Sequence, residues 1–274
     1  MEKLRTEAID AQIKRAKELK QQIMELIEAG SIDESFEGLA ALKKVIELST
    51  EGYNFVLEER SSGKTDRMKG MLSGPLFTSA SYPIPLSKKG KQMVPVVQLD
   101  LKDATNISGL SLGDGLLQVW FDDIDTYEDI TRVIPREEVN LSNLTSFEFN
   151  KEGHWILSDE WPFLKDGSSL QILGYESAGI AAINTSFLSM YINGDTEDAF
   201  SEELIGLLEK FDDVATNSSD LFSGFYGIQY NAEDFAPSRR CLIAIHDWSS
   251  LGKAQIFYEF NEKGKTSFNF AHAR

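Results

Sequence analysis

Carboxylates gather in two places along this chain with the alternation of a calcium-binding loop. One group runs from Asp122 to Asp129, and the other runs from Asn193 to Asp198. An EF-hand loop needs a glycine at its sixth position and a bidentate glutamate at its twelfth, and both groups lack these residues. A helix N-terminus explains the second group better, because carboxylates there oppose the positive end of the helix dipole. We therefore expect neither a metal ion nor a cofactor.

Residues that could act as bases or nucleophiles are scattered. The histidines His154, His246 and His272 share no metal-ligand spacing. The glycine-rich segment 111–115 lacks the Lys-Ser/Thr pair of a phosphate-binding loop, and segment 174–179 does not fit a nucleophile elbow. No residue is expected to be catalytic, and the chain leans away from being an enzyme.

Acidic residues dominate the middle of the chain. The 274 residues carry a net charge of −17, and residues 122–234 alone hold 24 acidic and 5 basic residues. This excess of negative charge excludes nucleic acid as a partner, because binding its phosphates requires lysine and arginine. It suits a basic protein partner, whose encounter it would speed, and equally suits a solubilising face.

The residues expected to bind a partner combine the two acidic groups with one aromatic anchor. Trp161 and Phe163 follow a polar segment and are expected to be exposed. Other aromatic residues lie beside apolar runs and are expected in the core. The expected partner-binding residues are Asp122, Asp123, Asp125, Glu128, Asp129, Trp161, Phe163, Asp195, Glu197, Asp198, Glu202 and Glu203.

The composition indicates a globular cytoplasmic protein with no membrane association. Hydrophobic residues make up 42% of the chain, but no apolar run approaches the ~18 residues that would span a bilayer. The N-terminus is charged where a signal peptide would be apolar. The single cysteine, Cys241, lies in an apolar run and is expected to be a buried thiol.

The first 60 residues predict a helical hairpin. Apolar residues recur at three- and four-residue steps over residues 2–29, and Gly30 ends that helix. A capping-box pattern at Ser31–Glu34 begins a second helix that runs to about Ser49. The apolar stripe either holds the two helices of the hairpin together or forms the interface of a homodimer. The chain is accordingly expected to be a monomer or a homodimer.

From residue 61 onward the hydrophobic period becomes strand-like. One helix is expected at 195–213. Many strands with few helices favour an α+β fold with mainly antiparallel sheets. The expected strands are 94–101, 115–121, 130–134, 145–149, 155–157, 169–173, 225–230, 241–245 and 254–260.

Several short motifs in order resemble the YwqG-like family of bacterial proteins of unknown function. They run from Gly74-Pro75 through Tyr82-Pro83, Pro95, Gln98-Leu99-Asp100 and Leu116-Leu117-Gln118, with further similarity at 134–136 and 171–175. Ser73 departs from the family, which usually has the first glycine of a Gly-Gly pair there. The resemblance implies one α+β domain over residues 61–274 with an internal pseudo-duplication, and it brings no agreed activity. Residues 1–60 would be an appended module.

Three functional hypotheses follow from these patterns. The leading one is a non-enzymatic protein-binding module, in its most concrete form an immunity protein that neutralises a bacterial toxin. A second is a small-ligand-binding protein or enzyme, with a groove between the pseudo-repeats where Tyr82, Gln98, Gln118 and Gln255 converge. A third is a dimeric structural protein that uses the helical hairpin.

Overall fold

The computed structural model describes residues 7–32, 39, 42–43, 46, 51–108, 111–122, 128–150, 168–180, 200–214, 240–245, 253–260 and 266–273. The chain divides into two compact units. The first holds Phe55–Tyr175 and Asp247–Arg274 with Met1–Glu2, and the second holds Lys3–Asn54 and Glu176–His246. The expected domain boundary at residue 60 stays a prediction.

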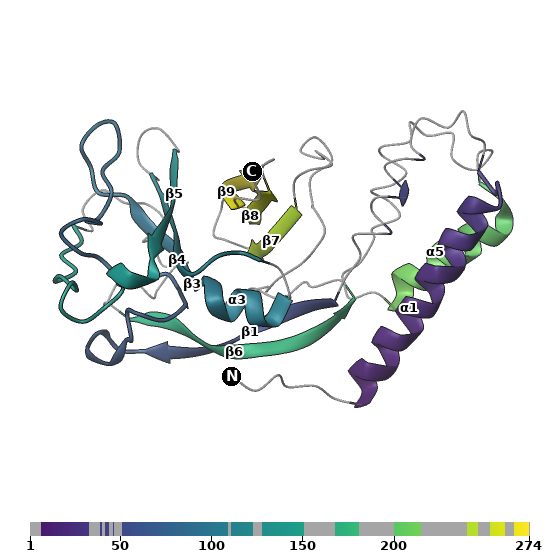
Figure 1. The fold of residues 1–274 in the computed structure, drawn as a ribbon, viewed down its shortest axis with the longest axis horizontal. Coiled ribbons are helices and arrows are strands. Elements are labelled where there is room, and N and C mark those ends of the chain that lie inside the picture. Colours follow the sequence, from purple (N-terminus) through teal and green to yellow (C-terminus); the bar gives the residue numbers. More distant parts are fainter. Residues whose placement is uncertain are drawn as a thin grey trace. The chain divides into compact units, whose positions relative to one another are not determined.

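A six-stranded sheet dominates the fold, and its order is β1-β6-β2-β3-β4-β5 (Figure 1). The pairings of β2 with β3 and β6, and of β4 with β3 and β5, are antiparallel. The fold is therefore α+β. The strands of this sheet are β1 (Glu51–Arg60), β2 (Met71–Leu72), β3 (Val94–Asp100), β4 (Gly115–Phe121), β5 (Asp129–Pro135) and β6 (Ser169–Ile180).

The central strands β3 and β4 are buried at all seven of their positions. This explains why their sequences are nearly continuous apolar runs with a few polar interruptions. Gly115 begins β4 at φ +132°, and a Cβ there would lie 2.2 Å from the carbonyl oxygen of Ile134 on β5. Only glycine fits this close approach of the two strands.

A short helix follows β3 without a loop. Asp100 ends the strand, and its Oδ1 accepts hydrogen bonds from the backbone N–H groups of Lys102 and Asp103 at 3.0 and 3.4 Å. This N-cap starts α3 (Leu101–Ser108). Two 3-10 turns, η1 (Ser62–Lys64) and η2 (Arg136–Glu138), complete the described elements of this region.

A three-stranded sheet has the order β7-β8-β9. Its strands are β7 (Arg240–Ile245), β8 (Lys253–Phe260) and β9 (Thr266–Ala273). Strands were expected at the first two positions, and β9 pairs antiparallel with β8 along the whole of both strands. The pairs β3–β4 and β7–β8 belong to different sheets, so the internal duplication stays a prediction.

Two long helices pack side by side, α1 (Glu7–Glu28) and α5 (Glu202–Val214) (Figure 1). Gln12 Nε2 donates to the carbonyl of Val214 at 2.7 Å, and Ser201 N donates to the carbonyl of Ser31 at 3.3 Å. The start of one helix therefore lies at the end of the other, as in an antiparallel pair. No helix within the described ranges is long and apolar enough to cross a membrane.

The buried stripe of α1 has the helical spacing that the sequence predicts. It consists of Ile13, Ala16, Leu19, Ile23 and Ile27. The sequence did not reveal that this stripe would face α5, which lies more than 170 residues further along the chain. In the predicted second helix, from Ser31 to about Ser49, only six residues are described. Of these, Leu42 and Ile46 are fully buried, and the hairpin stays a prediction.

One expected strand is wrong. Residues 145–149 form no ladder. Instead Thr145 N bonds to the carbonyl of Thr78 at 2.9 Å, and the ring of Phe147 stacks on Trp120 with centroids 6.3 Å apart. The alternating apolar residues of this segment therefore pack on the sheet without pairing as a strand. The expected strands at 155–157 and 225–230 lie outside the described residues.

Candidate functional site

A row of polar residues crosses the six-stranded sheet. Gln171 on β6 and Gln98 on β3 both lie opposite Met71 on β2, while Gln118 on β4 lies opposite Gln98 and Arg132 on β5. Residues directly opposite each other point to the same face of a sheet. The row therefore places three amides and a guanidinium on one face, with only a methionine between them.

The central amides of this row use all their hydrogen-bonding capacity within the protein. Gln98 Oε1 accepts from Phe77 N at 2.8 Å and from Gln118 Nε2 at 2.7 Å. Gln98 Nε2 donates to the carbonyls of Arg67 and Lys69 at 2.9 and 2.7 Å. An amide has two donors and two acceptor lone pairs, so Gln98 has none left for a ligand.

Gln118 is saturated in the same way. Its Nε2 donates to Gln98 and to the carbonyl of Phe77 at 2.7 Å. Its Oε1 accepts from Trp120 Nε1 at 3.1 Å and from Arg132 Nε at 2.9 Å. Both glutamines are fully buried. Their role in the structure is to satisfy backbone groups of residues 67–77 in the interior.

Arg132 is held by carbonyls and rings rather than by a carboxylate. Besides Gln118, it donates to the carbonyls of Pro83 and Tyr82 at 2.8 and 3.3 Å. Its guanidinium lies 5.4 Å from the ring centre of Trp120 and 5.8 Å from that of Tyr82. Burial lowers the pKa of Arg132 to about 10, so the group is charged at neutral pH.

Arg67 repeats this arrangement on the segment that the glutamines hold. It donates to the carbonyls of Pro75, Leu76 and Thr145 and to Thr78 Oγ1, at 2.7 to 3.1 Å. Burial lowers the pKa of Arg67 to about 10 as well. Within the described part of the chain, both arginines donate to carbonyl, hydroxyl or amide oxygens rather than to carboxylates. No sequence pattern indicated that they would be partly buried.

The proposed groove residues are only partly brought together. Tyr82, Gln98 and Gln118 are linked through Arg132, whereas Gln255 lies on β8 opposite Ala271. Because the two amides near Tyr82 are saturated, they offer no polar group to a small molecule.

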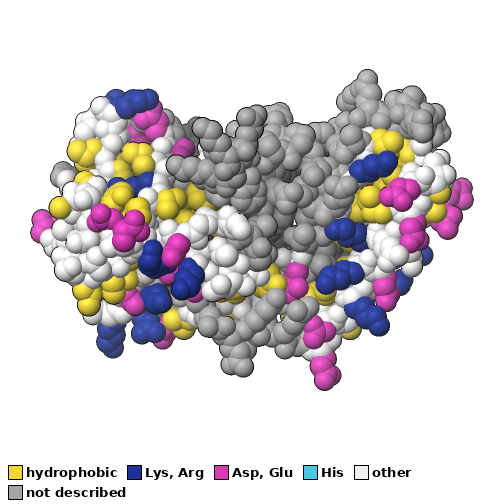
Figure 2. Space-filling model, in the orientation of Figure 1, with side chains coloured by type: hydrophobic (Ala, Val, Ile, Leu, Met, Phe, Trp, Pro, Cys, Tyr) yellow, Lys and Arg dark blue, Asp and Glu magenta, His cyan; other side chains and the backbone are white. Residues whose placement is uncertain are grey.

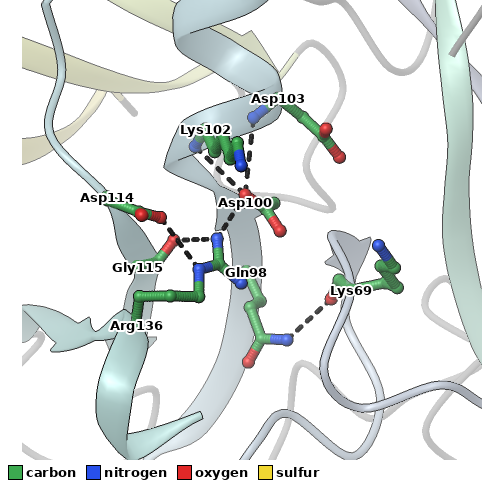
Figure 3. A network of polar contacts seen from close by, with 8 residues as sticks. All are labelled: Lys69, Gln98, Asp100, Lys102, Asp103, Asp114, Gly115 and Arg136. Carbon is green, nitrogen blue, oxygen red and sulfur yellow. Dashed lines mark hydrogen bonds and ion pairs between the residues drawn. The ribbon is translucent and has the colours of Figure 1, made fainter.

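A second polar network surrounds the start of α3 (Figure 3). Arg136 donates from Nη2 to Asp100 Oδ1 at 2.5 Å and from Nε to Asp114 Oδ1 at 2.8 Å. Asp100 is only 5% exposed, so the guanidinium compensates a carboxylate that burial would otherwise destabilise. The hydrogen bond from Arg136 lowers the pKa of Asp114.

Asp103 is another ionisable group in this network, and its carboxyl is partly buried. Burial, together with the negative charge of Asp100, raises its pKa. Figure 3 shows its side chain leaving α3 on the side of Lys69, whose charge partly offsets that rise. Tyr175 is buried, and burial followed by the charges of Asp103 and Asp100 raises its pKa. A carboxyl whose pKa is shifted by burial and by a neighbouring charge is a candidate for a functional group.

The first acidic group is not an exposed patch throughout. Asp122 is 1% exposed, and its backbone N–H bonds to the carbonyl of Glu128 at 2.8 Å. This corrects the expectation that Asp122 is exposed, because it is buried directly after the end of β4. Glu128 forms an ion pair with Lys88, and Asp129 is exposed at the start of β5. Asp123 and Asp125 lie outside the described residues.

The second acidic group continues along α5. Glu202 and Glu203 are exposed in its first turn, and Glu209 and Asp213 are exposed further along. Sequence reasoning missed the last two, although their helical spacing opposite the apolar stripe could have shown them. Asp195, Glu197, Asp198, Trp161 and Phe163 lie outside the described residues.

The outer side of α5 is therefore a mainly acidic surface, with Lys210 as its exposed cation. Figure 2 shows acidic side chains along the surface of α1 and α5, with basic ones among them. Within the described ranges, no three His, Cys, Asp or Glu side chains are grouped as a metal site would require. No protein-family model and no curated protein matches this chain.

Proposed function

We propose that this chain is a protein-binding module whose acidic surface on α5 receives a basic protein. The observation that carries the proposal is the exposure of Glu202, Glu203, Glu209 and Asp213 along one helix. Carboxylates of one sign on a rigid element raise the association rate with an oppositely charged partner. The saturated amides Gln98 and Gln118 support a binding rather than a catalytic role, since neither has a hydrogen-bonding group left for a substrate.

The more concrete form of the proposal is a cytoplasmic immunity protein that neutralises a bacterial toxin. Its support is the net charge of −17, concentrated in the middle of the chain. Small acidic inhibitors commonly block basic toxins, but this is an analogy between classes of protein. Trp161 and Phe163, which lie outside the described residues, belong to the same proposal as expected anchors.

The test compares two variants of equal charge change. Glu209→Lys with Asp213→Lys alters the last turns of α5, where lysine favours the helix dipole and should leave the fold intact. Glu59→Lys with Glu176→Lys makes the same change at exposed strand residues. Tagged full-length proteins are used to capture partners from the source cells at 50 mM and 500 mM NaCl.

The expected result is one stoichiometric basic protein that wild type and the strand variant retain at low salt. High salt and the α5 variant should both release it, since salt screens the charges. That protein, expressed alone in a bacterial host, is expected to arrest growth, and co-expression of this chain should restore it. If the α5 variant and wild type retain the partner equally, the acidic surface of α5 is not the binding site.

A small-ligand or catalytic role is the alternative, and Asp103 now motivates it better than the glutamines do. Its partly buried carboxyl lies with Lys69 and Tyr175 around α3. The dimeric alternative has less support, because the apolar stripe of α1 is already buried within one chain.

A further inference from the structure

Leu141 projects into solvent from the loop of residues 136–145, here called the tip loop. It is 72% exposed, against 56% for Leu86, the next most exposed large apolar side chain in the described part of the chain. A single exposed leucine is common on protein surfaces. The distinguishing feature of Leu141 is how firmly its loop is held.

Two asparagines fix the tip loop from within. Asn140 Oδ1 accepts from Asn143 N at 3.0 Å and from Ser142 Oγ at 2.5 Å, while Asn140 Nδ2 donates to the carbonyl of Glu137 at 3.2 Å. Asn143 Nδ2 donates to the carbonyl of Glu138 at 2.9 Å. These bonds enclose Leu141 on both sides in the sequence, so its backbone has little freedom.

Two apolar residues of the tip loop, one on each side of Leu141, pack against the core. Val139 and Leu144 pack against the buried cluster of Phe77, Leu116 and Ile134. A side chain presented on such a rigid loop loses little conformational entropy when it binds, and buried apolar anchors of this kind carry much of the energy of protein interfaces.

The charges beside Leu141 indicate the kind of partner. Glu137 is exposed and Glu138 is partly exposed, whereas the nearby cation Arg136 is occupied by Asp100 and Asp114. An acidic rim disfavours an anionic lipid surface. It also disfavours a second copy of a chain whose net charge is −17.

We propose that the tip loop is a protein-interaction surface whose Leu141 enters an apolar pocket on the partner, with lysine or arginine at the pocket rim facing Glu137. The proposal rests on the proposed function in one respect, that the partner is a basic protein. It adds a contact from the first unit that the acidic surface of α5, in the second unit, does not provide.

A photocrosslinker at the two exposed leucines tests this contact. Full-length Leu141→benzoylphenylalanine and Leu86→benzoylphenylalanine proteins are irradiated in the source cells, and adducts are mapped by mass spectrometry. The expected result is one adduct specific to position 141, on an apolar residue of the partner with lysine or arginine beside it. Equal adducts at both positions, or an adduct on a surface without basic residues, would overturn the proposal.

Affinity separates this proposal from the proposed function. With the protein captured by wild type as the probe, Leu141→Asp should weaken binding about tenfold or more, while Leu86→Asp should leave it unchanged. Both variants should melt with wild type, because both leucines are exposed. If Leu141→Asp binds normally and the α5 variant does not, the tip-loop proposal fails and the proposed function stands. If wild type captures no basic protein, both fail.

Discussion

Gln98 and Gln118 lie directly opposite each other on β3 and β4, and Gln118 Nε2 donates a 2.7 Å hydrogen bond to Gln98 Oε1. The two amides are fully buried, and they satisfy backbone groups of Phe77 in the interior and of Arg67 and Lys69 in a partly buried segment. These amides are therefore structural, and this separates the sheet face from the interaction surfaces proposed above.

Replacing Gln98 should destabilise the fold strongly. Gln98→Leu leaves Phe77 N and the carbonyls of Arg67 and Lys69 without partners, at a cost of roughly 3 kcal/mol or more in the free energy of unfolding. Gln92→Leu is the control, because Gln92 also bonds to backbone groups, of Glu148 and Asn150, but near solvent. It should cost less than about 1 kcal/mol, since water replaces those bonds. Equal losses in chemical denaturation would contradict this account.

Ser73→Gly should stabilise the protein. Ser73 has a φ of 55° and is fully buried, and its hydroxyl has no hydrogen-bond partner among the described residues. Glycine relieves the backbone strain and removes the orphan hydroxyl, for a net gain of about 1 kcal/mol after its entropic cost. Gly74→Ala is the contrasting change, because its Cβ would lie 2.4 Å from Ser169 Cβ. It should lower the melting temperature, and a Ser73→Gly protein that also melts earlier would count against strain at this position.

Asp103→Asn should change how stability depends on pH. The pKa of Asp103 is raised above the ordinary value of 3.8 in the folded protein, so the native state binds the proton more tightly than the unfolded state. Wild-type stability therefore falls as pH rises from about 3.8 through the raised pKa. The Asp103→Asn variant should therefore become more stable than wild type as pH rises through that window, and it should remain more stable at neutral pH.

Asp114→Asn should change the pH dependence of stability in the opposite direction. The pKa of Asp114 is lowered by Arg136, so its contribution is present above the ordinary value and is lost as pH falls through the lowered one. Urea denaturation from pH 3 to 8 should show the two variants diverging from wild type in opposite directions at neutral pH. Parallel profiles would mean that neither carboxyl is coupled to folding.

Leu19→Ala should destabilise the packing of α1 on α5. Leu19 is fully buried in the stripe of α1, and truncating such a leucine costs on the order of 2–5 kcal/mol. Glu18→Ala, at the adjacent exposed position, should change little. Amide hydrogen exchange should show faster exchange in both α1 and α5 for Leu19→Ala. Exchange that rises in α1 alone would indicate that α5 does not depend on this stripe.

Local pattern was a good guide wherever neighbouring residues decide the structure. Strands β3, β4 and β5 and helix α5 lie close to their predicted ranges, because short apolar runs bounded by turn residues favour strands and three- and four-residue spacing favours a helix. The pattern failed at 145–149, where aromatic side chains pack on Trp120 without forming a ladder. It also failed at Asp122, since a run of carboxylates does not show which of them turns inward.

The sequence by itself determined the acidic middle of this protein, the helices α1 and α5, and the strands whose apolar runs stand out locally, such as β3, β4 and β8. Tertiary structure alone decided that α1 packs on α5 and that Gln171, Gln98, Gln118 and Arg132 fall in one row. The physical reason is that register and helix partners are set by contacts between residues far apart in the chain. A one-residue shift of a strand would have turned the same amides to the other face.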